Sequence, residues 1–294
     1  MLGILLVDKP IGLTSHDVVS RARRVFSTKR VGHAGTLDPQ ATGLLVLAVG
    51  PATRFLQYLP LEPKEYLGTI TFGVTTNSFD AEGEITDTQP VPANLEELIQ
   101  EHLPKFRGGI SQLPPMFSAV KKAGKPLYTY ARKGEEVERA ERRVVIDTYD
   151  IVKIDGPHVD VRIICSGGTY VRSLAHDLGQ AVGCGAHLSA LRRTRIGKFS
   201  VEEARVIDDF GPEDLWSLDQ ALPPTPVVKL NEGQLRHIQH GQPARLRETP
   251  SYTHVALADP DGMVVGVGRV HGELVHPEIV IPFDALYELE TESL

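Results

Sequence analysis

The stretch Val31-Gly32-His33-Ala34-Gly35-Thr36-Leu37-Asp38-Pro39-Gln40-Ala41-Thr42-Gly43-Leu44-Leu45 places one carboxylate, that of Asp38, in a glycine-flanked loop just before an apolar strand. The glycines can adopt backbone angles that are closed to other residues, and Pro39 stiffens the loop. The carboxylate is therefore predicted to be held in place by the backbone. Most loop aspartates only hydrogen-bond their own backbone, so the spacing alone leaves a simple turn open as the alternative.

The bulk composition is that of a soluble globular protein, with 41% apolar and 23% charged residues in a chain of 294. This length predicts one large domain, or a large one with a small one. The apolar residues 3–7 are too few for a signal peptide, and no apolar run is long enough to cross a bilayer. The two cysteines, Cys165 and Cys184, form no CxxC motif, so neither a disulfide framework nor a zinc site is expected. A cytoplasmic location is predicted.

The charge distribution is more informative than the net charge of -7, which by itself argues against a nucleic-acid partner. Lysine and arginine are concentrated in three segments, while the acidic residues gather from position 202 to 219 and near the C-terminus. Such polarity allows one face to bind an anionic backbone, although each cluster can also be a solvated surface. The basic segments are residues 21–30, residues 105–143 and residues 192–198.

Hydrophobic periodicity predicts alternating strands and helices over the first two thirds of the chain. Residues 44–49 form a continuous apolar run that is typical of a strand buried on both faces. The other predicted strands are residues 3–7, 66–73, 144–154 and 159–165. The predicted helices are a segment capped by Thr14 or Ser15, residues 94–102, and residues 169–182, which end at Gly183.

Three further segments have a distinct composition. Residues 111–143, called the insert below, are rich in lysine and poor in large apolar residues, and they predict a long, partly mobile loop with a function. Residues 222–226 hold three prolines and predict a linker. Beyond it, residues 255–270 predict a hairpin and residues 278–283 another strand.

Five segments, in this order along the chain, resemble motifs of the bacterial TruB family of tRNA pseudouridine synthases. Five ordered motifs are hard to obtain by chance, which makes this resemblance far more specific than the spacing around Asp38. The segments are DKPIGLTS at 8–15, GHAGTLDPQATGLL at 32–45, Lys64-Glu65-Tyr66 with Gly68, CSGGTYVR at 165–172, and LRRT at 191–194.

The resemblance implies an α+β fold with two domains. Residues 1–222 would form the catalytic pseudouridine synthase domain, with a mixed, mainly antiparallel sheet flanked by helices and loops. Residues 223–294 would form a small β-rich, PUA-like RNA-binding domain. The implied reaction converts uridine to pseudouridine at position 55 in the T-loop of tRNA, by base flipping, without a guide RNA and without a cofactor. The expected partner is the T-arm of tRNA, bound by a monomer that needs no protein partner and no membrane.

The same resemblance implies three catalytic residues. Asp38 is the expected nucleophile, or an equivalent essential carboxylate, because a fixed carboxylate can trap or stabilise cationic character at an anomeric carbon. The atom that it attacks is left open. Arg172 is the expected charge partner, which would keep Asp38 ionised and lower its pKa. Tyr66 is expected to stack on the extracted uracil while its hydroxyl reaches the edge of the base.

Five more positions are expected to bind the substrate, and none to bind a metal. Tyr170 and Leu191 would complete the pocket wall, and His33 would fill the stack when the base leaves. Asp80 aligns with an acidic position of the family, but its neighbours depart from the Thr-Asp-Thr-x-Asp pattern. Lys9 would serve the core as much as the RNA. Without the family, each of these has a plain structural interpretation as a core or turn residue.

Three alternative functions are kept. A guide-dependent pseudouridylase is the nearest, although such relatives usually lack a long basic insert at this place. A noncatalytic RNA-binding or RNA-folding protein would not need Asp38, Tyr66 and Arg172 together. A nucleoside hydrolase would release free uracil, but no motif supplies the second carboxylate that it would normally use beside Asp38.

Overall fold

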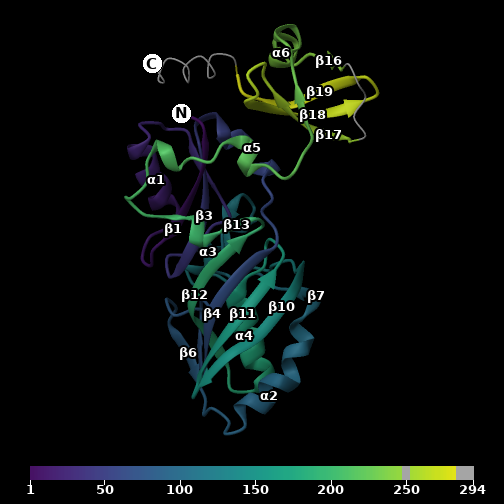
Figure 1. Ribbon diagram of the computed structural model, residues 1–294. Helices are drawn as coiled ribbons and strands as arrows, with labels where there is room; N and C mark the ends of the chain where they lie inside the picture. Colours follow the sequence, from purple (N-terminus) through teal and green to yellow (C-terminus); the bar gives the residue numbers. More distant parts are fainter. Residues whose placement is uncertain (247–251, 283–294) are drawn as a thin grey trace.

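The computed structural model describes residues 1–246 and 252–282, and its main element is a large mixed sheet (Figure 1). The ten strands of this sheet are β1 (Gly3–Lys9), β2 (Val31–Ala34), β3 (Ala41–Val49), β4 (Lys64–Phe72), β7 (Gly108–Gln112), β10 (Arg142–Asp155), β11 (His158–Cys165), β12 (Ala186–Ile196), β13 (Phe199–Ser200) and β14 (Arg205–Val206). Their order is β14-β1-β3-β12-β4-β11-β10-β7, with β2 paired to β3 and β13 to β12. Only β1–β14 and β3–β12 are parallel among these pairs, which confirms the predicted fold class.

Helix α1 (Ser15–Val25) covers one face of the β1–β3 half of the sheet, where Val18, Val19 and Ala22 pack against β1 and β3. Thr14 caps this helix through a reciprocal pair of hydrogen bonds with Asp17, as the sequence predicts. The opposite face of β1 and β3 is also buried, against the 3-10 helix η1 (Gly50–Tyr58) and segments from the end of the chain. Strand β3 is therefore buried on both sides, which confirms the interpretation of its apolar run.

Helices α2 (Leu95–His102) and α4 (Val171–Val182) lie together on one face of the other half of the sheet (Figure 1). Leu95 and Ile99 of α2 and Leu174 and Leu178 of α4 form one core with β4, β10 and β11. Gly183 ends α4 with a φ of 93°, a left-handed conformation that glycine adopts without steric cost.

Strand β12 joins the two halves and was not predicted from the sequence. It pairs with β4 along most of its length but contacts β3 over only three residue pairs, from Leu191 opposite Ala41 to Arg193 opposite Gly43. A Cβ atom at Gly43 would lie 2.2 Å from the carbonyl oxygen of Arg193, so only glycine lets the two strands approach this closely.

The insert contains less helix and strand than the rest of the chain. It contains the strands β8 (Lys121–Lys122) and β9 (Lys125–Pro126), which pair, and the one-turn helix α3 (Leu127–Ala131). The remaining small elements before the C-terminal region are a ribbon of β5 (Val74–Thr76) with β6 (Ile85–Thr88) and the 3-10 helices η2 (Leu103–Phe106), η3 (Val201–Glu203) and η4 (Pro212–Asp214).

A second, five-stranded sheet lies near the C-terminus (Figure 1). Its order is β15-β17-β18-β19-β16, and its elements, with the two helices of this region, are α5 (Leu218–Ala221), β15 (Val227–Lys229), α6 (Glu232–Gln239), β16 (Ala244–Arg245), β17 (His254–Ala258), β18 (Val264–His271) and β19 (Leu274–Val280). The predicted hairpin is confirmed. The strand predicted at 278–283 begins earlier, at Leu274, and Phe283 lies outside the described residues.

The two sheets share an apolar core. Val265 and Ile279 of the second sheet are buried in the same cluster as Ile4 and Leu6 of β1 and Leu222 before the prolines. A domain boundary after residue 222 therefore cuts through a packed interface, and the division stays a prediction. Among the described residues, no helix is long and apolar enough to cross a membrane.

Candidate active site

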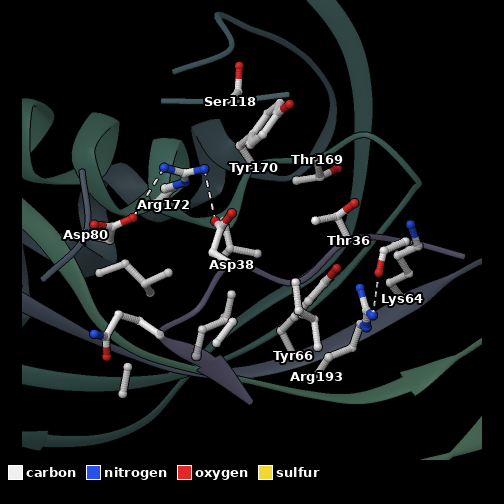
Figure 2. A pocket seen from close by; sticks show the side chains of 18 of the residues that line it. Thr36, Asp38, Lys64, Tyr66, Asp80, Ser118, Thr169, Tyr170, Arg172 and Arg193 are labelled. Atoms are coloured by element: carbon white, nitrogen blue, oxygen red, sulfur yellow. Dashed lines mark hydrogen bonds and ion pairs between the residues drawn. The ribbon is translucent and has the colours of Figure 1, made fainter. Parts of the chain in front are cut away.

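A cavity of about 290 Å³ lies where the β2–β3 loop, β4, β12 and the first turn of α4 meet (Figure 2). Its volume is near the lower end of the range of small-ligand pockets, about 300–1,000 Å³. Six of the eight predicted site residues line it: Asp38, Tyr66, Asp80, Tyr170, Arg172 and Leu191.

Arg172 connects the two carboxylates of the cavity. Its Nη2 lies 2.9 Å from Oδ2 of Asp38, and its Nη1 lies 3.3 Å from Oδ2 of Asp80 and donates to the carbonyl oxygen of Ser78 at 3.3 Å. The side chain of Arg172 is 7% exposed, that of Asp80 is 11% exposed, and that of Asp38 is 47% exposed at the cavity surface. The guanidinium thus fixes the direction of Asp38 while leaving it open to a ligand.

The pairing of Asp38 with Arg172 was predicted correctly, but the direction of its pKa was not. Burial raises the pKa of Asp38 above its ordinary value of 3.8; Arg172 offsets part of this rise, and the negative charge of Asp80 adds to it. The lowered pKa predicted from Arg172 alone is therefore wrong, because the second carboxylate and the desolvation of the loop outweigh the arginine.

The N-terminal motif, residues 8–15, holds the loop of Asp38 through hydrogen bonds. Ser15 accepts a hydrogen bond from the backbone N–H of Leu37 at 2.9 Å, and Gly12 donates to the carbonyl of Pro39 at 2.8 Å. The ammonium of Lys9 donates to the carbonyls of Pro10, Leu13 and Pro39 at 3.0, 2.7 and 3.3 Å. The first two motifs along the chain are thus one structural assembly.

Lys9 and His33 lie outside the cavity lining. Lys9 is fully buried, and burial lowers its pKa to about 8, so it acts on Asp38 as a nearby charge and on the loop as a hydrogen-bond donor. His33 lies on β2 with its ring edge-on to His16 at 5.9 Å between centroids. Burial lowers the pKa of His33, so its ring is neutral near pH 7.

Asp80 is held rigidly by the turn whose sequence departs from the family pattern. Ser78 donates to Oδ1 of Asp80 at 2.5 Å, and the backbone N–H of Glu82 donates to the same oxygen at 3.1 Å. Asn77, where the pattern has aspartate, accepts from the N–H of Glu84 at 3.1 Å. The asparagine oxygen thus performs a turn contact that a carboxylate oxygen can also make.

Tyr66 and Tyr170 form aromatic walls on different sides of Asp38 (Figure 2). Tyr66 is 7% exposed, and burial raises the pKa of its hydroxyl above 10. The backbone of Tyr170 is fixed by the amide of Gln112 from β7, with hydrogen bonds of 2.8 and 3.0 Å. Together with Leu191 from β12, these rings give the cavity apolar walls, and Asp38 lies at the edge of the space between them, called the slot below.

Comparison with known proteins agrees with this arrangement. The model of the "TruB family pseudouridylate synthase (N terminal domain)" matches residues 23–171, and that of the "tRNA pseudouridylate synthase B C-terminal domain" matches residues 172–216. The tRNA pseudouridine synthase B of Pseudomonas aeruginosa (strain UCBPP-PA14) is 43% identical over 282 residues, with 91% of each chain covered. The chain belongs to the TruB family.

A second relative of the same name, from Burkholderia mallei (strain NCTC 10247), is 42% identical over 292 residues and covers 95% of this chain and 96% of its own. Among solved structures, a chain of a Cbf5-Nop10-Gar1 complex superposes with a TM-score of 0.65 at 28% identity, over 96% of this chain and 86% of that one. A chain of an H/ACA RNP bound to a substrate RNA containing 2'-deoxyuridine gives a TM-score of 0.65 at 26% identity over the same shares. The TruB family resemblance seen in the motifs is thus confirmed.

Two charged cavity residues, Lys64 and Arg193, lie in the quoted motifs but were not proposed as site residues. Arg193 is 1% exposed, and its side chain donates to the carbonyls of Leu44 and Gly35, both at 2.8 Å. The signal was present, because residues i and i+2 of a strand share a face and Leu191 and Arg193 differ by two. Within the described residues, no cluster of His, Cys, Asp and Glu is arranged to bind a metal.

The raised pKa of Asp38 gives a testable pH dependence. Asp80→Asn removes a negative charge that raises this pKa, so the carboxylate of Asp38 should stay ionised to lower pH than in the wild type. The acid limb of the single-turnover rate of uridine conversion, measured against pH at saturating RNA, is therefore expected to move to lower pH.

Asp177→Asn is the matched control for this prediction. Asp177 lies on α4, like Arg172, and burial raises its pKa to about 6, but it does not contribute to the pKa of Asp38. The acid limb should keep its position in this variant. If the acid limb moved in Asp177→Asn but not in Asp80→Asn, the ionisation of Asp38 would not be what controls it.

Proposed function

We propose that this protein converts uridine to pseudouridine at position 55 in the T-loop of tRNA, without a guide RNA. The observation that carries the proposal is the bridge of Arg172 between Asp38 and Asp80 at the edge of a cavity walled by Tyr66, Tyr170 and Leu191. The near full-length similarity to tRNA pseudouridine synthase B of two bacteria supports tRNA as the substrate.

Asp38 is the essential carboxylate in this proposal. When the bond between C1′ and N1 of the uridine breaks, the sugar becomes electron-deficient at C1′, and a fixed carboxylate at the edge of the slot stabilises or traps it. Arg172 orients Asp38 and balances its charge. Asp80 orients Arg172 from the other side, because it binds the opposite nitrogen of the same guanidinium.

The flipped uracil is proposed to occupy the slot between the aromatic and apolar walls. Tyr66 stacks on the base, while Tyr170 and Leu191 close the slot. Lys9 supports this arrangement by holding the loop of Asp38. His33, a flat neutral ring on β2 outside the slot, is proposed to fill the space that the base leaves in the RNA stack.

The RNA contacts of the whole protein are also proposed. A monomer binds the T-arm with its basic segments, the second sheet in residues 223–294 serves as a PUA-like RNA-binding domain, and the reaction takes place in the cytoplasm, needing no protein partner. The exposed lysines of the insert support this, because Lys121, Lys122 and Lys125 lie on the short β8–β9 ribbon next to the cavity residue Ser118. Residues 247–251 and 283–294 of the proposed domain lie outside the described residues.

The decisive experiment is incubation of the protein alone with an unmodified tRNA transcript, followed by mapping of pseudouridine. Conversion at position 55 supports the proposal. The likeness to chains of Cbf5 and H/ACA complexes favours a guide-dependent enzyme as the second candidate, and conversion only after guide RNA is added would establish it. Release of free uracil would instead establish a hydrolase.

The insert is expected to become ordered on the T-arm. Its backbone forms few regular hydrogen bonds, and its lysines are exposed, so an anionic partner supplies the contacts that it lacks. Amide hydrogen exchange in residues 111–143 should therefore slow when tRNA is added. Helix α2, which lies away from the cavity, is the internal control, and an unchanged rate in the insert would show that it does not contact the RNA.

A further inference from the structure

Arg193 is a buried cation in the wall of the cavity. Its side chain is 1% exposed, and in the described part of the chain no carboxylate oxygen lies within 4.0 Å of its nitrogens. Its side chain donates to the neutral carbonyls of Leu44 and Gly35. Because an uncompensated buried charge is costly, this arginine is a strong local source of positive potential at the wall of the cavity.

The hydroxyl of Tyr66 is the group that transmits this charge to the cavity. Arg193 stands directly opposite Tyr66 in the register of β12 and β4, and the two side chains lie next to each other in Figure 2. A guanidinium can only donate, so the phenol oxygen is the acceptor, and its own proton is free to donate elsewhere. Within residues 1–246 and 252–282, the Tyr66 hydroxyl has no protein acceptor, so its proton is available to a ligand.

Lys64 adds a second positive charge at the same end of the cavity. A Cβ atom on Gly35 would lie 3.2 Å from Nη1 of Arg193 and 3.5 Å from Nζ of Lys64, so the two cations flank one glycine. At the other end, the single charge of Arg172 is shared by Asp38 and Asp80. The cavity is therefore electrically polarised, with its two carboxylates, balanced by Arg172 and Lys9, at one end and excess positive charge beside Tyr66.

The proposed reaction separates charge in the same sense. Breaking the C1′–N1 bond leaves its electron pair on the uracil ring and makes C1′ electron-deficient. After the base turns, C5 bonds to C1′, the proton on C5 is lost and N1 gains a proton, so the isomerisation balances without an oxidant or a reductant. Between these two steps the free base carries a negative charge that the site has to stabilise.

We propose that Arg193 acts through the Tyr66 hydroxyl to stabilise the detached uracil anion, with Lys64 contributing its charge. The inference rests on the proposed function and assigns roles within the same site. Tyr66 stacks on the base with its ring, and its hydroxyl reaches the edge of the base as a hydrogen-bond donor to a uracil oxygen. Arg193 is a positioning residue, which keeps this donor directed into the cavity and polarises it as charge develops.

The test is a double-mutant cycle with Tyr66→Phe, Arg193→Met and the double variant, on tRNA that carries either uridine or 5-fluorouridine at the target. Fluorine withdraws electrons and stabilises the ring anion, so it lowers the need for the donor. Single-turnover loss of the N-glycoside is measured at saturating tRNA. The matched control is Arg205→Met, which removes an exposed arginine of β14 that pairs with Asp214.

With uridine, Arg193→Met is expected to slow bond cleavage by about tenfold or more, with tRNA affinity nearly unchanged, since a single preorganised donor contributes about 10²–10³ in rate. The loss should be at least threefold smaller with 5-fluorouridine. The double variant should be about as slow as Tyr66→Phe, because Arg193 acts through the hydroxyl. Arg193→Lys, which keeps the charge, should recover part of the rate.

Equal losses with both bases, or losses that multiply in the double variant, would overturn the inference. If Arg193→Met does not fold, as judged by circular dichroism and thermal unfolding, Tyr66→Phe carries the test alone, and an equal loss with both bases would again contradict it. A wild-type protein that forms no pseudouridine would instead remove the proposed function itself.

Discussion

Asp38→Asn is expected to reduce pseudouridine formation below about one per cent of the wild-type rate while tRNA affinity changes by less than about tenfold. The amide keeps the shape of the side chain and can still accept a hydrogen bond from Arg172, but it cannot trap or neutralise an electron-deficient C1′. The loop itself should stay in place, because Lys9, Gly12 and Ser15 hold it through contacts that do not involve the carboxylate.

Single-turnover conversion of tRNA and a filter-binding affinity measure the two halves of this prediction. Asp87→Asn, an exposed acid on β6, is the matched control and should leave both unchanged. Residual conversion well above one per cent in Asp38→Asn would remove Asp38 from its proposed role, and a large loss of affinity would show that it binds RNA directly.

Arg172→Met is expected to abolish most activity at pH 7 and also to destabilise the fold. Without the guanidinium, Asp38 and Asp80 lose the cation that binds them both, so the pKa of Asp38 rises further. We expect a loss of more than a hundredfold in single-turnover rate and a loss of about 2 to 3 kcal/mol in the free energy of unfolding, the scale for an orphaned buried charge.

In Arg172→Met, the loss of activity and the loss of folding stability should respond to pH in opposite directions. Activity should recover partly as pH rises, because Asp38 must be ionised. Stability should recover as pH falls, since carboxylates whose pKa is raised in the folded state are least costly when protonated. Urea unfolding of the single variant Arg172→Met is compared with that of the double variant that also carries Asp80→Asn. The added Asp80→Asn should restore the free energy of unfolding that Arg172→Met loses. Parallel pH responses would contradict the proposed charge balance.

The sequence predicted those parts of the fold in which a local pattern carries the information. Strand β3 has a continuous apolar run, helix α1 has a capping residue and an apolar face, and helix α4 ends at a glycine. The loop of Asp38 was also predicted, because glycine and proline act on the backbone directly. In each case the pattern that predicts the element lies within a few residues along the chain.

Strand β12 could not be predicted in this way. Its segment 192–195 holds three arginines in four residues, which is typical of a solvated surface, and yet Arg193 is buried at the centre of the sheet. Its burial depends on carbonyls of Gly35 and Leu44, which are about 150 residues away, and on a glycine at position 43 that lets the backbones meet. The pKa of Asp38 was missed for the same reason, since Asp80 and the surrounding protein act on it through space.

The place of β12 between β3 and β4 also determines when the site comes into existence. The loop of Asp38 leaves the ribosome early, but the strand that fixes its distance from β4 is made only some 150 residues later. At translation rates of about 5–20 residues per second, this delay lasts roughly eight to thirty seconds. During that interval the nascent chain exposes the edges of both halves of the sheet, so the addition of β12 both completes the cavity and covers these edges against misassembly.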